Sequence, residues 1–112
     1  MKKNILEETA KEYFSSGCDE YAKERFNAAV VLFFKALVTY IDLLLLQKTG
    51  QTPSSHTERF RMTQKELPEV YNILDKDFPF YQSSYVQKLT KELAEVIKKD
   101  AQIVAKKAGI TL

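Results

Sequence analysis

The chain has 112 residues, of which 45% are apolar and 29% charged, and this composition fits one globular domain over residues 1–112. Its 17 basic and 15 acidic side chains leave a net charge of +2, which excludes a polycation that holds nucleic acid by charge alone. One cysteine and one histidine exclude an intrachain disulfide and a zinc site with four Cys/His ligands.

The first predicted helix covers residues 4–16. Its apolar residues recur every three to four positions and form one stripe: Ile5, Leu6, Ala10, Tyr13 and Phe14. Gly17 is predicted to end the helix, because glycine readily adopts the left-handed conformation found at helix C-termini. Glu7 and Glu8 follow the first lysines where a secretory signal would have an apolar run, so we expect an intracellular, cytoplasmic protein.

The second predicted helix, residues 19–48, is the most apolar segment of the chain, and Asp19 is expected to cap its start. It is long and apolar enough to resemble a membrane span. Lys35 and Asp42 interrupt it, however, and each charge at mid-bilayer costs about 2.5–3.5 kcal/mol. We therefore predict a buried helix and no membrane association.

One side of this second helix is predicted to bind a partner. A full apolar stripe already accounts for the core-facing side, yet the opposite side, where Lys35 and Asp42 align, is also largely apolar. A single bundle of this size would leave part of that surface in water, so we expect a second copy of the chain to cover it. The helix residues expected to contact the partner are Val31, Val38, Leu45 and Leu46.

A loop is predicted over residues 49–55, and a third helical region over residues 55–76. Pro68 is predicted to break this region, because proline lacks a backbone N–H and clashes with the preceding turn. Residues 75–83 are predicted to be irregular and contain several aromatic side chains. They either plug the end of the bundle or form a recognition patch in which Phe80 contacts a partner.

The last predicted helix covers residues 84–107 and has a lysine-rich outer face. We interpret this face as ordinary solvated surface, with a phosphate-binding face as the alternative. No segment shows the alternation of a strand. The predicted fold is therefore all-α, an antiparallel up-down four-helix bundle whose third helix is broken near Pro68.

The most unusual local feature is the segment 55–61, which holds the only histidine and two of the three arginines. On a helix, His56, Arg59 and Phe60 would share one face. A histidine beside arginines at a helix start is a candidate contact for phosphate. The candidate nucleotide- or RNA-binding residues are therefore His56, Arg59 and Arg61.

The alternative interpretation of this segment is structural. His56 would then help to cap the helix, and the arginines would pair with Glu58 or Glu66. No metal, cofactor or catalytic residue is predicted, because the chain has no glycine-rich phosphate loop and no Glu-x-x-His pair.

The order of features from Tyr13 to His56 resembles a known family. A short helix, Gly17, an aromatic–alanine pair and a long alanine-rich amphipathic helix are followed by a proline-containing loop and by Ser55-His56, which opens a third helix. This pattern resembles the HEPN superfamily (higher eukaryotes and prokaryotes nucleotide-binding), especially its small stand-alone prokaryotic members, over residues 10–100.

The resemblance implies an antiparallel helical bundle that dimerises and acts in a toxin–antitoxin or defence system, often beside a nucleotidyltransferase. Some members of the family cleave RNA without a metal, using an arginine followed four to six residues later by a histidine. Here only Arg25 precedes His56, and it is far away in the sequence. The motif is missing, so no catalytic role is transferred to any residue.

Three functions remain open from the sequence. The first is a non-catalytic, dimeric HEPN-like module that binds a nucleotide, RNA or a partner protein. The second is a metal-independent endoribonuclease that uses His56 with Arg59 or Arg61. The third is a structural adaptor bundle. The missing motif favours a function that is not enzymatic.

Overall fold

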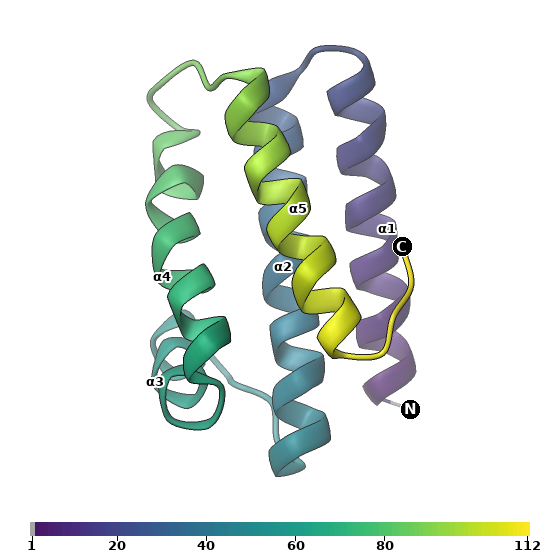
Figure 1. Ribbon diagram of the computed structural model, residues 1–112, viewed down its shortest axis with the longest axis vertical. Coiled ribbons are helices and arrows are strands. Elements are labelled where there is room, and N and C mark those ends of the chain that lie inside the picture. Colours follow the sequence, from purple (N-terminus) through teal and green to yellow (C-terminus); the bar gives the residue numbers. More distant parts are fainter. Residues whose placement is uncertain (1) are drawn as a thin grey trace.

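The computed structural model describes residues 2–112, which form helices joined by turns and loops (Figure 1). The helices are α1 (Lys2–Ala22), α2 (Phe26–Thr49), α3 (His56–Glu66), α4 (Pro68–Ser83) and α5 (Lys91–Lys107). No strand occurs in this part of the chain, so the all-α prediction is confirmed. The described residues form five helices where the sequence predicted four, because the break at Pro68 separates α3 from α4.

The central element is α2, which packs against α1 and α5 along much of its length and against α3 and α4 on its remaining side (Figure 1). Within residues 2–112 it is the one helix long and apolar enough to cross a membrane. Its most apolar window has a mean hydropathy of 2.2, and 67% of that window is buried by the rest of the protein. The prediction of a buried core helix is confirmed.

The residues predicted to bind a partner are buried or half-buried within the single chain. Leu45 is completely buried and Val38 is only 9% exposed, while Val31, Leu46 and Phe80 are half-buried. Besides α1 and α5, both α3 and α4 pack on α2, so the chain itself covers more of this helix than a simpler bundle would. The homodimer and its contact residues stay predictions, and Val31, Leu46 and Phe80 are the ones that keep part of their surface exposed.

Gly17 does not end the first helix, because α1 continues through it to Ala22. A Cβ atom at Gly17 would lie 2.7 Å from two ring carbons of Phe33 in α2. The glycine therefore permits close approach of α1 and α2. The reversal comes later, where Glu24 adopts φ = 60°, and α2 begins at Phe26 instead of at the predicted Asp19.

Residues 75–83 are helical and belong to α4, so the predicted irregular stretch was wrong. Pro79 lies inside this helix. The neighbouring Phe78 and Tyr81 pack on Phe34 of α2, with ring centroids 6.0 Å and 4.7 Å away. This aromatic packing stabilises the helix although Pro79 cannot donate a backbone hydrogen bond.

The segment 84–90, predicted as the start of the last helix, is a loop that leads into α5. Thr90 caps α5, since its hydroxyl accepts a hydrogen bond from the backbone N–H of Leu93 at 3.2 Å. Asn27 of α2 holds the loop through three hydrogen bonds to its backbone. A tertiary contact, which local periodicity cannot reveal, thus fixes the connection between α4 and α5.

Candidate functional site

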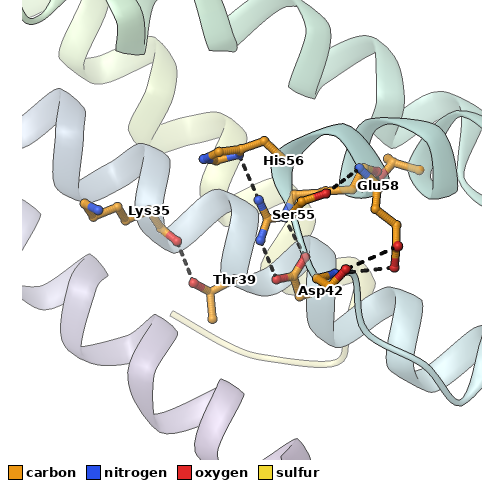
Figure 2. Close-up of polar contacts among 9 residues, drawn as sticks. Lys35, Thr39, Asp42, Ser55, His56 and Glu58 are labelled. Carbon is orange, nitrogen blue, oxygen red and sulfur yellow. Dashed lines mark hydrogen bonds and ion pairs between the residues drawn. The ribbon is translucent and has the colours of Figure 1, made fainter.

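The acidic residue in the middle of the apolar α2 is paired with an arginine of α3. Arg59 Nε donates to Asp42 Oδ1 at 2.8 Å and Arg59 Nη2 donates to Asp42 Oδ2 at 2.9 Å (Figure 2). Both side chains are largely buried, with 14% and 13% of their surfaces exposed. The predicted pairing of Arg59 with Glu58 or Glu66 was therefore wrong, because the buried carboxylate of α2 provides a bidentate partner.

His56 is the first residue of α3, but it does not cap the helix. The cap is Ser55, whose hydroxyl accepts from the backbone N–H of Glu58 at 3.1 Å (Figure 2). His56 Nδ1 instead lies 2.9 Å from Arg59 Nη1. Because arginine can only donate, Nδ1 is the acceptor, and the neutral ring carries its proton on Nε2.

The surroundings of His56 favour this neutral form. Partial burial of this surface residue lowers the pKa of the ring below its ordinary value of 6.5, and the positive charge of Arg59 lowers the pKa further. Asp42 acts in the opposite direction, and Lys35 again lowers the pKa. His56 is therefore a neutral N–H donor at pH 7, and Nε2 makes no hydrogen bond to the residues drawn in Figure 2.

A pocket of about 210 Å³ lies beside this group and draws its lining from four helices. The lining residues are Tyr13 of α1, Phe34, Lys35, Val38 and Thr39 of α2, His56 and Arg59 of α3, and Tyr81 of α4. Lys35 has no ion-pair partner within residues 2–112. The pocket therefore combines one uncompensated cation with a histidine N–H and aromatic walls.

Aromatic rings continue from the pocket wall to the protein surface. Tyr81 stacks on Phe34 at a centroid distance of 4.7 Å, and Tyr85 meets Tyr81 edge-on at 5.8 Å. The hydroxyl groups of the two tyrosines lie 3.1 Å apart. Tyr85 is 73% exposed, so a planar ring is available to solvent beside the pocket.

Two of the three predicted site residues come together and the third does not. His56 and Arg59 line the pocket, whereas Arg61 is exposed and outside it. The sequence analysis missed Lys35 and Thr39 as site residues. Their spacing could have identified them, because Lys35, Thr39 and Asp42 are polar residues on one face of an otherwise apolar helix.

No group of three or more His, Cys, Asp or Glu side chains within residues 2–112 is arranged to hold a metal ion. Comparisons with protein families, with curated proteins and with solved structures found no match for the chain. The functional argument therefore depends on the pocket itself.

Proposed function

We propose that the chain is a non-catalytic, HEPN-like binding module whose ligand is a nucleotide held in the pocket of Lys35 and His56. The observation that supports it is one pocket with an uncompensated ammonium group, an imidazole N–H and tyrosine rings. The first two bind phosphate oxygens by charge-assisted and neutral hydrogen bonds. Tyrosine rings provide faces and edges on which a base packs.

The hydrogen bonding of His56 supports binding over RNA cleavage. A neutral general base must present an unprotonated nitrogen to its substrate. In this site Arg59 occupies Nδ1, so Nε2 carries the proton and can only donate. Arg59 is itself held by Asp42, and Arg61, the alternative catalytic arginine, lies outside the pocket.

A dimer, a nucleotidyltransferase partner, a toxin–antitoxin or defence setting and a cytoplasmic location are also part of this proposal. They come from the resemblance to the HEPN superfamily, from the apolar pattern of the second predicted helix and from the sequence that follows the first lysines. The nucleotide pocket needs none of them, because its lining residues belong to a single copy of the chain. Ligand binding can therefore be tested with the isolated protein.

The test is calorimetric titration of the protein with nucleoside 5′-monophosphates. Replacing Lys35→Met keeps most of the side-chain stem and removes the charge, so we expect at least ~10-fold weaker binding from the loss of one charge-assisted contact. Lys106→Met is the matched control, since Lys106 is an exposed lysine of α5 outside this pocket.

Two results would contradict the proposal. One is the absence of nucleotide binding at millimolar concentration, and the other is an equal loss of affinity in the Lys35→Met and Lys106→Met variants. Incubation of the protein with single-stranded RNA tests the alternative function directly. Metal-independent cleavage that is lost in His56→Ala would support the endoribonuclease instead.

A further inference from the structure

We infer that this pocket selects a terminal, doubly ionised phosphate group over an internal phosphodiester. The inference rests on the proposed function and names the chemical class of its ligand. Two observations support it: the donors of the residues that line the pocket, and the charge that remains after the internal pairs are formed.

The donors come from α2 and α3. Arg59 uses Nε and Nη2 on Asp42 and Nη1 on His56, so its guanidinium is mostly occupied inside the protein. Lys35 retains its ammonium donors, and His56 retains the proton on Nε2. Both groups require acceptors without protons, and a terminal phosphate dianion offers three such oxygens where a phosphodiester offers two.

The charges favour the same ligand. Asp42 cancels the charge of Arg59, which leaves Lys35 as the net positive charge of the pocket. A phosphate monoester carries about −1.5 to −2 charges at pH 7, so its attraction to a single cation is about 1.5 to 2 times that of a singly charged diester. A diester keeps only one charge. The attraction to Lys35 is therefore stronger for the monoester than for the diester, although both contain phosphate.

A dianion also changes the protonation of His56. The charged or titratable groups around the ring are Lys35 and Asp42 from α2, Arg59 from α3, Tyr13 from α1 and Tyr81 from α4. A bound dianion opposes the effects of Lys35 and Arg59, so it favours the imidazolium form. Protonation adds a second positive charge to the pocket and ends the Arg59 contact at Nδ1. Binding is thereby coupled to proton uptake.

The exposed ring of Tyr85 adjoins the pocket, because it contacts the lining residue Tyr81 at a centroid distance of 5.8 Å. A phosphate group held by Lys35 and His56 would therefore leave the base of the same nucleotide near an aromatic ring.

The experiment compares adenosine 5′-monophosphate with adenosine 3′,5′-cyclic phosphate, a diester of the same base and sugar. Binding is measured by calorimetry, together with the imidazole NMR signal of His56, which is unambiguous because the chain has one histidine. We expect at least ~10-fold tighter binding of the monoester and a higher pKa of His56 in its complex. Inorganic phosphate and adenosine should each bind more weakly than the monoester.

The outcomes separate the inference from the proposed function. Equal affinity for monoester and cyclic diester overturns the selection of a terminal phosphate and leaves nucleotide binding standing. If no probe binds, both fail. If inorganic phosphate binds as tightly as the monoester, the dianion selectivity is supported and the nucleotide is overturned as the ligand.

A His56→Gln variant tests the contribution of the ring. Glutamine keeps an N–H donor but cannot take up a proton, so we expect the preference for the monoester to fall several-fold while the cyclic diester loses little affinity. His56 is exposed at the start of α3, which makes a folded variant the expected result, and circular dichroism verifies it. An unchanged preference would overturn the coupling to proton uptake. The same coupling predicts that wild-type affinity for the monoester weakens as pH rises above neutrality.

Discussion

The ammonium group of Lys76 in α4 lies between two buried carboxyl groups, 2.9 Å from Asp100 Oδ2 of α5 and 3.7 Å from Asp77 Oδ1. Asp77 is completely buried, and no N–H or O–H among the described residues donates to its oxygens. Burial, followed by the neighbouring carboxyl group of Asp100, raises the pKa of Asp77 to about 8. Lys76 partly compensates, with Nζ 2.9 Å from Asp100 Oδ2. Asp77 therefore holds a proton at neutral pH.

This proton makes folding stability depend on pH. The folded-state pKa of Asp77 lies above the unfolded value, so its contribution is fully present below about pH 4 and is lost as pH rises through about 8. We expect Asp77→Asn to be most beneficial, relative to wild type, above pH 8. Urea unfolding between pH 5 and pH 9 measures this difference. A difference that does not change with pH would contradict the assignment.

Replacing Gly17→Ala should destabilise the protein. The added Cβ would lie 2.7 Å from the buried ring of Phe33, and overpacking of this kind costs about 1–3 kcal/mol. The gain of about 1 kcal/mol in helix propensity offsets only part of that cost. Chemical denaturation provides the measurement, with the exposed Ser15→Ala in the same helix as control. Equal stability of the two variants would show that Phe33 can move aside.

The pair of Asp42 and Arg59 should contribute to stability far more than a surface ion pair. Asp42→Asn leaves the guanidinium without its buried partner, and we expect a loss of about 2–3 kcal/mol. Glu20→Gln is the control, because Glu20 pairs at 3.7 Å with Arg25, whose side chain is 65% exposed. The expected loss of folding free energy at this surface pair is about 0–1 kcal/mol. A double-mutant cycle on Asp42 and Arg59 that gives no coupling energy would refute this ranking.

Removal of the Arg59 charge should raise the pKa of His56. Burial is the main cause that lowers this pKa, and Arg59 is the next, so the Arg59→Gln variant should titrate closer to 6.5 than wild type. The pH dependence of the imidazole NMR signal measures both values. Asp42→Asn should shift the pKa in the opposite direction, because Asp42 raises it. Identical titration curves in all three proteins would mean that these charges do not reach the ring.

Asn27→Ala should release the loop between α4 and α5. The side chain of Asn27 donates to the carbonyls of Ser84 and Gln87 at 3.0 Å and 2.7 Å and accepts from the N–H of Leu89 at 2.9 Å. We expect faster amide hydrogen exchange at Leu89 and a stability loss of about 1–3 kcal/mol. Asn72→Ala, at an exposed position of α4, is the matched control. Unchanged exchange at Leu89 in Asn27→Ala would show that the loop is held by other contacts.

Helical periodicity was sufficient for the class of fold and for the core helix. The apolar residues of α2 recur at helical spacing. Pro68 lacks a backbone N–H and therefore interrupts the helix between α3 and α4, independently of tertiary packing. Helix ends were less predictable. Gly17 was expected to end α1. It instead lies inside the helix, where the absence of a side chain leaves room for the ring of Phe33, a residue that is distant in sequence.

The sequence by itself determined an all-helical chain with an apolar second helix and placed His56 and Arg59 on one helical turn, because these features depend on spacing within a few residues. Only the tertiary structure decided that Asp42 binds Arg59 across 17 residues and that Lys35 shares a pocket with His56. Such pairs form when separate helices pack and water is excluded between them. Local sequence carries the donors and acceptors, while packing decides which of them meet.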